Sequence, residues 1–386
     1  MIIELHAIQS FAPANLNRDD QGAPKDCTFG GVPRARVSSQ SWKRAMRVAF
    51  REAPETIETG TRTKRAHKAI VERVEALDPD VAQDVARHRA ALLLQAEPLG
   101  LSLGSQDGDD DVKTGQLVFF RSSDLDTLAE LAIEHGEELD GLSSSIEGGR
   151  AKDRVKPALP RDIATVVKHA MTSPGAALDV ALFGRLVAEL PEANVDAACQ
   201  VAHAVGTHRI AYEGDYYTAV DDLKPEDTEG ADMIGEVQFN ASCFYRYAAL
   251  DVDQLVHNLG AGSDPQHLTA SLGAFARAFV TTAPTGKQTT FAARNLPAAV
   301  LAVRRGRGAA NLINAFVAPV NASEDDRGIP AASVARMLTE YTTLERMYGA
   351  TDGSTTAVLL SSVDGGDGPW GHAGHVDDVV AHASHV

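Results

Sequence analysis

The sequence has little cysteine: Cys27, Cys199 and Cys243 are the only ones among 386 residues, and they lie far apart. An odd, scattered trio predicts neither a disulfide framework nor a zinc site, and a reducing compartment suits it best. No apolar run reaches the roughly 18 residues of a membrane-spanning helix. The N-terminus lacks the basic and apolar regions of a signal peptide. We therefore expect a soluble cytoplasmic protein without a membrane partner.

The sequence also has fewer basic than acidic residues. It contains 36 Lys and Arg against 53 Asp and Glu, which gives a formal net charge of -17. Such an acidic chain is a poor candidate for indiscriminate coating of nucleic acid. A narrow basic track remains possible, since affinity depends on charges near the phosphates and not on the total. The length allows one large elaborated domain or two.

The basic residues are concentrated in the stretch from Leu16 to Arg51. The part from Cys27 to Arg51 contains no acidic residue. A basic run inside an acidic chain indicates an anionic ligand. Its six basic residues are Arg34, Arg36, Lys43, Arg44, Arg47 and Arg51.

A helix is expected to begin after Ser38 or Ser39, either of which can cap it. Lys43, Arg47 and Arg51 recur at steps of four on one face. Like charges at this spacing cost an isolated helix about 0.2–0.5 kcal/mol per pair, and a bound phosphate would offset that cost. A solvated basic face explains the pattern equally well. The expected apolar face consists of Trp42, Ala45, Met46 and Ala49.

The remaining pattern predicts an α+β fold, with a sheet built from both ends of the chain around a mainly helical middle region. Residues 10–33 are expected to be a loop, 195–205 a helix, 208–237 a long hairpin and the last dozen residues a loose tail. The other expected strands are 2–8, 116–121, 239–249, 297–304 and 355–360. The other expected helices are 65–96, 123–139, 268–280 and 329–348.

Signatures of catalysis and of metal binding are weak. Gly286 and Lys287 lie in a turn that resembles a phosphate-binding loop, but Thr281 stands where its first glycine belongs, so a phosphate contact by Lys287 is all that remains. Asp19 and Asp20 are candidate carboxylates for a metal, although capping of their own loop is the favoured interpretation. We expect no catalytic residue, no metal and no cofactor. Four tail histidines are interpreted as exposed and without a specific metal: His372, His375, His382 and His385.

Several motifs together resemble the CasC-type backbone subunit of the type I-E CRISPR Cascade complex, a member of the RAMP superfamily. They occur in the expected order over most of the chain. The matching segments are Asn17 to Asp20, Lys25-Asp26, Phe29 to Gly31, Arg36 to Ser41, Lys43 to Ala45, Asp179 to Arg185, Thr218 to Asp222, Phe244 to Tyr247, Gly286 to Gln288 and Thr290 to Ala292.

The resemblance implies a modified RNA-recognition-motif (ferredoxin-like) palm with a helical fingers insertion and a β-hairpin thumb. It assigns 1–56 and 238–386 to the palm, 57–192 to the fingers, 193–206 to a palm helix and 207–237 to the thumb. It also implies a subunit without enzymatic activity that polymerises along the spacer of the guide RNA (crRNA). Its partners would be the crRNA, the target DNA strand, further copies of itself, other Cascade subunits and a recruited nuclease-helicase.

Carried over by motif, a set of cations and polar side chains would hold the guide backbone. Such groups bind phosphates without reading bases, as recognition of any spacer demands. The set consists of Arg18, Lys25, Ser38, Gln40, Lys43, Arg44 and Arg47, with Asn17 and Lys287 as possible additions.

The thumb and the fingers supply a second group of candidates. Tyr216, Tyr217 and Thr218 fall where relatives carry aromatic residues that wedge against bases, and stacking on tyrosine is worth about 1–3 kcal/mol per base. Core tyrosines of a hairpin are the competing interpretation. Leu182 or Phe183 is expected to pack against a displaced base. A basic loop that is a candidate contact for target DNA carries Arg150, Lys152, Arg154 and Lys156.

Two other functions fit the same pattern. One is a RAMP-fold ribonuclease that cuts guide or target RNA with His6 or the Asp19 and Asp20 pair, although a lone strand histidine is more often structural. The other is a monomeric binder of single-stranded RNA. Incubation with RNA, and a mass measurement with and without a guide, separate the three.

Overall fold

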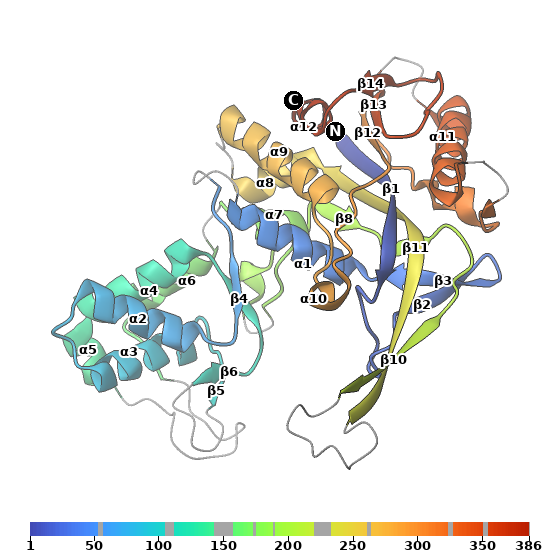
Figure 1. The fold of residues 1–386 in the computed structure, drawn as a ribbon. Helices are drawn as coiled ribbons and strands as arrows, with labels where there is room; N and C mark the ends of the chain where they lie inside the picture. The colour runs from blue at the N-terminus through green and yellow to red at the C-terminus, as the bar shows by residue number, and fades with distance from the viewer. Residues whose placement is uncertain are drawn as a thin grey trace, which may run out of the picture. The chain divides into compact units, whose positions relative to one another are not determined.

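The computed structural model describes residues 1–52, 57–104, 112–142, 157–172, 175–187, 190–219, 233–260, 264–322, 327–349 and 354–385. The chain forms two compact units (Figure 1). The first consists of residues 1–53, 199–253 and 265–386, and the second of residues 54–198 and 254–264. The fold is therefore mixed α/β, and the first unit contains both ends of the chain.

A ten-stranded sheet forms the first unit. Its central strand β1 (Ile2–Ala14) pairs in antiparallel fashion with β11 (Met233–Asp251) on one side and β12 (Ala299–Arg305) on the other (Figure 1). The sheet order is β14-β13-β12-β1-β11-β9-β3-β2, and β8 and β10 pair with β11. The other strands are β2 (Asp26–Phe29), β3 (Val32–Val37), β8 (Cys199–Val201), β9 (Ala204–Gly206), β10 (Glu213–Ala219), β13 (Thr356–Ser361) and β14 (Gly371–Ala373).

Strand β1 is buried on both faces of the sheet. Its side chains Ile3, Leu5, Ala7 and Ile8 have at most 1% of their surface exposed. Neighbouring strands alone cannot bury both faces of a strand, so apolar helices must supply the rest. The helices of the first unit are α1 (Ser39–Ala49), α9 (Pro265–Thr281), α10 (Gln288–Phe291), α11 (Ile329–Tyr348) and α12 (Val376–Ser384), with the 3-10 turns η1 (Phe50–Glu52) and η4 (Leu312–Phe316).

The second unit is mainly helical and has its own apolar core, built from α2, α3, α4 and α6. Its two small ribbons pair β4 with β7 and β5 with β6, and α8 (Val252–Leu259) begins in the first unit and ends in the second. Its helices are α2 (Ala66–Leu77), α3 (Gln83–Gln95), α4 (Ser122–Glu134), α5 (Gly136–Asp140), α6 (Arg161–Thr172) and α7 (Leu178–Phe183), with the 3-10 turn η3 (Pro191–Ala193). Its strands are β4 (Thr61–Thr63), β5 (Leu103–Gly104), β6 (Lys113–Thr114) and β7 (Val118–Phe120).

Most predicted helices and strands are confirmed, but residues 10–33 are not simply a loop. Strand β1 continues to Ala14, because its backbone pairs with β11 as far as Asn240. Residues 26–37 form a β2–β3 hairpin whose two-residue turn is Gly30-Gly31, with φ of 59° and 78°. Both glycines are left-handed, as a tight hairpin turn requires.

Two further predictions are wrong. Residues 193–206 do not form a helix: β8 and β9 pair with β11, and β9 also pairs with β3, so pairing in the sheet decides the conformation. The C-terminal residues are not a loose tail. They form α12, capped by His375 and anchored by the buried side chains of Val379 and Ala383.

In the part of the chain that the structure describes, no helix combines the length and the apolar character needed to cross a membrane.

The centre of the sheet contains a buried polar cluster. Glu4 accepts hydrogen bonds from Tyr247 and Arg305, and the Nδ1 atom of His6 lies 2.9 Å from the hydroxyl of Tyr245. His6 has no exposed surface. Burial, together with the charge of Arg305, lowers its pKa from 6.5 to about 3. The ring is therefore neutral at pH 7.

We expect His6 to make the protein acid-sensitive. An unfolded chain binds a proton at His6 below about pH 6.5, whereas the folded chain does so only near pH 3, so stability falls by about 1.4 kcal/mol per pH unit in this window. Between about pH 7 and about pH 5 the wild type should lose roughly 2 kcal/mol more than His6→Gln. Urea unfolding at both pH values measures the difference.

The matched control is His372→Gln, on exposed strand β14, which should keep the wild-type dependence. Equal losses for wild type and His6→Gln would show that His6 does not bind a proton on unfolding.

Candidate nucleic-acid interface

The loop after β1 is held by its own side chains. The carboxylate of Asp19 accepts hydrogen bonds from the backbone N–H groups of Gln21 and Ala23, each at 2.9 Å. The amide of buried Asn15 donates to the carbonyls of Gly22 and Gln238. Asp19 therefore caps the loop, in agreement with the favoured sequence interpretation. The side chain of Arg18 is presented on this fixed loop and is exposed.

Asn17 joins two predicted binding residues, Ser38 and Lys25. Its side-chain oxygen accepts the N–H of Ser38, and its backbone carbonyl accepts the N–H of Lys25, both at 2.9 Å. Ser38 is the residue before the first turn of α1. Asn17 is half-buried, so its polar atoms fix the loop to the start of the helix.

Helix α1 has the amphipathic arrangement that its sequence predicts. Trp42, Ala45 and Met46 are buried. Ser38 occupies the N-cap position but its hydroxyl makes no capping hydrogen bond, and only 7% of its surface is exposed. On the other faces Gln40 and Arg44 are exposed, and Lys43 and Arg47 are half-buried.

A buried arginine holds α1 against the sheet. The guanidinium of Arg246, on β11, lies 3.7 Å from the ring centroid of Trp42 and 4.5 Å from that of Phe279 on α9. It donates to the side-chain oxygen of Gln9 at 2.5 Å and to the carbonyl of Phe279 at 2.6 Å. Burial lowers the pKa of Arg246 to about 9. Two aromatic faces and two oxygens therefore surround this cation inside the fold.

One member of the basic run is structural. Arg34 has no exposed surface. Its Nη1 atom donates to the carbonyls of Gly206 and Thr207, and its Nη2 atom to those of Phe316 and Val317, at 2.8–3.2 Å. The guanidinium of Arg34 thus binds backbone carbonyls inside the fold. The other five basic residues of the run lie outside the core.

A groove of about 710 Å³ lies between the loop, α1 and the turn before α10. Arg18 and Arg44 line it, together with Thr285 and Gly286. A Cβ at Gly286 would stand 2.2 Å from the carbonyl oxygen of Leu16, so the two backbones touch. Lys287 follows with φ 50° and is half-buried. The turn that Lys287 belongs to is therefore part of the same surface as the basic helix.

The β10–β11 hairpin extends from the sheet and carries the two predicted tyrosines (Figure 1). Tyr216 is 72% exposed and Tyr217 is 42% exposed, which excludes the interpretation as core tyrosines. The ring of Tyr217 packs on the backbone of Gly235. A Cβ added to Gly235 would stand only 2.4 Å from that ring. Thr218 is also exposed. The hairpin turn, residues 220–232, lies outside the described residues.

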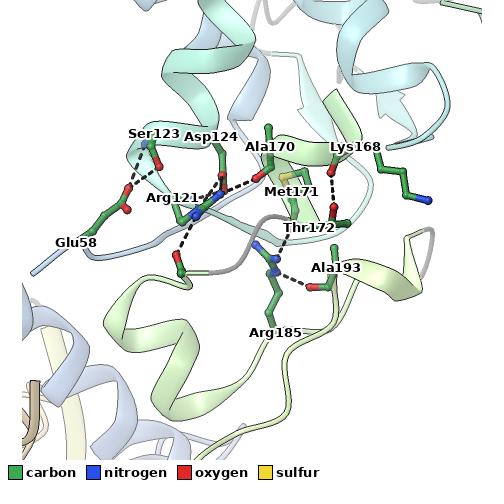
Figure 2. A network of polar contacts seen from close by, with 11 residues as sticks. Glu58, Arg121, Ser123, Asp124, Lys168, Ala170, Met171, Thr172, Arg185 and Ala193 are labelled. Atoms are coloured by element: carbon green, nitrogen blue, oxygen red, sulfur yellow. Dashed lines mark hydrogen bonds and ion pairs between the residues drawn. The ribbon is translucent and has the colours of Figure 1, made fainter. Parts of the chain in front are cut away.

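In the second unit, two arginine side chains bind carbonyl groups at the C-terminal end of α6. Arg121 donates to the carbonyl of Ala170 and pairs with Asp124, both at 2.7 Å, while Arg185 donates to the carbonyls of Met171 and Ala193 (Figure 2). These oxygens include the last turn of α6, which has no partner within the helix.

The two residues of the second unit predicted to contact a base, Leu182 and Phe183, differ in exposure. Leu182 has no exposed surface, so it cannot touch a base in this conformation, and that prediction is corrected. Phe183 is half-buried and stays a prediction. The loop predicted to contact target DNA lies outside the described residues: Arg150, Lys152, Arg154 and Lys156.

The candidate metal and catalytic groups are placed elsewhere. His6 is enclosed by the sheet. Within the described residues, the group of metal-ligating atoms that lie close enough together is His135, Glu138 and Asp162 in the second unit, and it contains neither Asp19 nor Asp20. His375 caps α12, and His382 contacts the carbonyl of Thr356.

Arg36 and His203 also belong to the basic surface, although neither was among the predicted binding residues. The Nη1 atom of Arg36 lies 3.1 Å from Nδ1 of His203. Arg36 is also next to Lys25, since its backbone N–H donates to the Lys25 carbonyl at 3.0 Å. The Gly30-Gly31 turn was the available signal, because a two-residue hairpin turn sets Lys25 opposite Arg36.

Comparison with known proteins gives a family and a set of similar structures. A family model described as CT1975-like protein matches residues 3–370. A chain of a structure titled "CRISPR RNA-guided surveillance complex, pre-nicking" has a TM-score of 0.83 and 29% identity, covering 99% of this chain and 100% of that one. A chain of a "CRISPR RNA-guided surveillance complex" has a TM-score of 0.74 and 26% identity, with the same coverage. No curated protein matches the chain.

We expect Gly286→Ala to destabilise the fold by about 1–3 kcal/mol, because its Cβ would overlap backbone atoms of Leu16 and Asn15 that cannot move cheaply. Gly273→Ala, in α9, is the matched control: its Cβ would stand 3.5 Å from Val380, an ordinary contact, and it should be neutral or stabilising by about 0.5–1 kcal/mol. Thermal and urea unfolding compare the two. Equal stability of both variants would contradict the predicted steric overlap at Gly286.

Proposed function

The chain belongs to the CT1975-like protein family, and we propose on that basis that it is a guide-RNA-binding backbone subunit of a type I-E CRISPR surveillance complex. The observation that carries the proposal is the full-length similarity to chains of RNA-guided surveillance complexes, with a TM-score of 0.83 and 99% coverage. Similarity over the whole chain concerns both units and not one shared domain.

The chemistry of α1 and its loop supports a guide backbone as the ligand. Arg18, Gln40 and Arg44 are exposed beside half-buried Lys43 and Arg47. Cations and amide or hydroxyl donors bind phosphates without distinguishing bases. A subunit that serves any spacer needs this kind of contact. The proposed phosphate-binding set is Arg18, Lys25, Ser38, Gln40, Lys43, Arg44 and Arg47, with Lys287 and, through the loop that it fixes, Asn17.

The hairpin supplies a different kind of contact. Tyr216 and Tyr217 expose apolar rings on a polar arm, and base stacking on such rings is tolerant of sequence. We assign Tyr216, Tyr217 and Thr218 to a thumb that interrupts base pairing at a regular interval. In this assignment the sheet is an RNA-recognition-motif-like palm and the helical unit is the fingers.

The proposed subunit is structural and does not cut RNA. The ribonuclease alternative needs His6 or the Asp19 and Asp20 pair. The ring of His6 is buried and its pKa lies near 3, and the carboxylate of Asp19 is hydrogen-bonded to its own loop. Buried His6 cannot reach a bound strand, and one carboxylate oxygen of Asp19 is already occupied by two N–H groups, so neither of these two side chains is a free general base. In the cytoplasmic complex, the target DNA strand, other subunits and a recruited nuclease-helicase would be its partners.

Assembly along RNA distinguishes this function from that of a monomeric RNA-binding protein. We expect native mass measurement of the purified protein to show oligomers whose copy number increases with the length of an added guide RNA. A mass of one chain per RNA at every length would favour the monomeric alternative. RNA recovered in cut form, with or without magnesium, would favour the ribonuclease.

Replacement of Lys43 and Arg47 by alanine should weaken RNA binding by a similar factor for every spacer sequence. Two lost phosphate contacts should reduce the slope of log affinity against log salt by about two. Fluorescence anisotropy with several unrelated RNAs over a salt series measures both quantities.

The charge-matched control replaces Arg307 and Arg346, which are exposed elsewhere in the same unit, and should leave the slope unchanged. A large loss for some spacers and none for others would contradict binding through the backbone.

A further inference from the structure

Lys25 and Arg36 form a like-charge pair across the β2–β3 hairpin. The register pairs Cys27 with Arg34 and Asp26 with Ala35, so Lys25 and Arg36 come next. Directly opposed residues of an antiparallel pair project from the same face, where like charges destabilise the sheet. A bound anion between the two side chains would remove this repulsion.

The imidazole of His203 lies beside this pair of cations. It is exposed, in the link between β8 and β9, and β9 pairs with β3 so that Val205 faces Arg36. The guanidinium of Arg36 can only donate a hydrogen bond. Nδ1 of His203, 3.1 Å away, is therefore the acceptor, and the ring is neutral with its proton on Nε2.

The charged groups around His203 favour this neutral form. Partial burial and the charges of Arg36 and Lys25 lower its pKa. On β2 the nearest acid, Asp26, accepts a hydrogen bond from Tyr212, and Arg36 donates through Nε to the Asp26 backbone carbonyl at 2.9 Å. On the side of β8, Lys43 of α1 acts on the buried Cys199 thiol. Among the described residues, the charged groups that act on His203 are thus the cations Arg36 and Lys25.

We propose that Lys25, Arg36 and His203 form an additional binding site for a phosphate of the guide RNA, and that His203 takes up a proton when the phosphate binds. This inference rests on the proposed function, because it extends the same backbone track. A phosphate oxygen beside the imidazole stabilises its charged form. The contact with Arg36 is then replaced, since the phosphate accepts hydrogen bonds from both cations.

Proton uptake makes the affinity depend on pH in a defined direction. Where the free protein has neutral His203 and the complex has charged His203, affinity rises as pH falls. A single coupled proton changes affinity by at most tenfold per pH unit. We expect RNA binding to be about tenfold tighter at about pH 5.5 than at about pH 8. RNA phosphodiesters keep their charge throughout this range.

The test measures binding of a fluorescent oligouridylate by anisotropy at both pH values and constant ionic strength. Uracil has no group that titrates between them, so the pH dependence comes from the protein. His203→Gln should bind equally well at both pH values, with the affinity of the wild type at high pH. His203→Lys, which is charged throughout, should bind at both with the affinity of the wild type at low pH.

His372→Gln, on strand β14 at the opposite edge of the sheet order, should keep the wild-type dependence, and circular dichroism checks the fold of each variant. A tenfold pH dependence in His203→Gln would overturn the inference while leaving the proposed function intact. Weak binding by His203→Lys at both pH values would do the same. A wild type that binds no oligouridylate at either pH would overturn the proposed function and this inference with it.

Discussion

The fixed position of α1 depends on the buried guanidinium of Arg246. A charge without water is stable only when oxygens and aromatic faces replace its hydration, and Arg246 has both, from Gln9, Phe279 and Trp42. The same contacts join β1, α9 and α1. The helix that carries the basic residues therefore cannot shift without exposing a cation to the apolar core.

The basic run of an acidic chain thus serves two purposes. The guanidinium of Arg34 donates hydrogen bonds to four backbone carbonyls of the first unit. Its role is therefore in folding. The remaining cations of the run lie outside the core, on α1, its following turn and strand β3. A net charge of -17 over the whole molecule leaves this surface as a local exception, which favours a ligand that follows a narrow track.

Sequence reasoning worked where one signal dominated. Helix α11 was predicted at its observed bounds, 329–348, because its period is long and regular. The core face of α1 was also predicted, since Trp42, Ala45 and Met46 are buried. It failed where distant partners decide the structure: β8 and β9 have a helical period but pair with β11. Likewise, no local pattern shows that Leu182 is enclosed, or that His203 meets Arg36.

The central position of β1 has a consequence for the synthesis of the protein. Its two neighbours are strands that end at Asp251 and Arg305, so β1 leaves the ribosome long before the strands with which it pairs. The second unit, residues 54–198 with a short later segment, emerges in between and has its own core. Non-local strand pairing is slow and leaves apolar strands uncovered meanwhile. The isoleucine and leucine side chains of nascent β1, which are buried in the folded protein, therefore stay uncovered until both partner strands have been made.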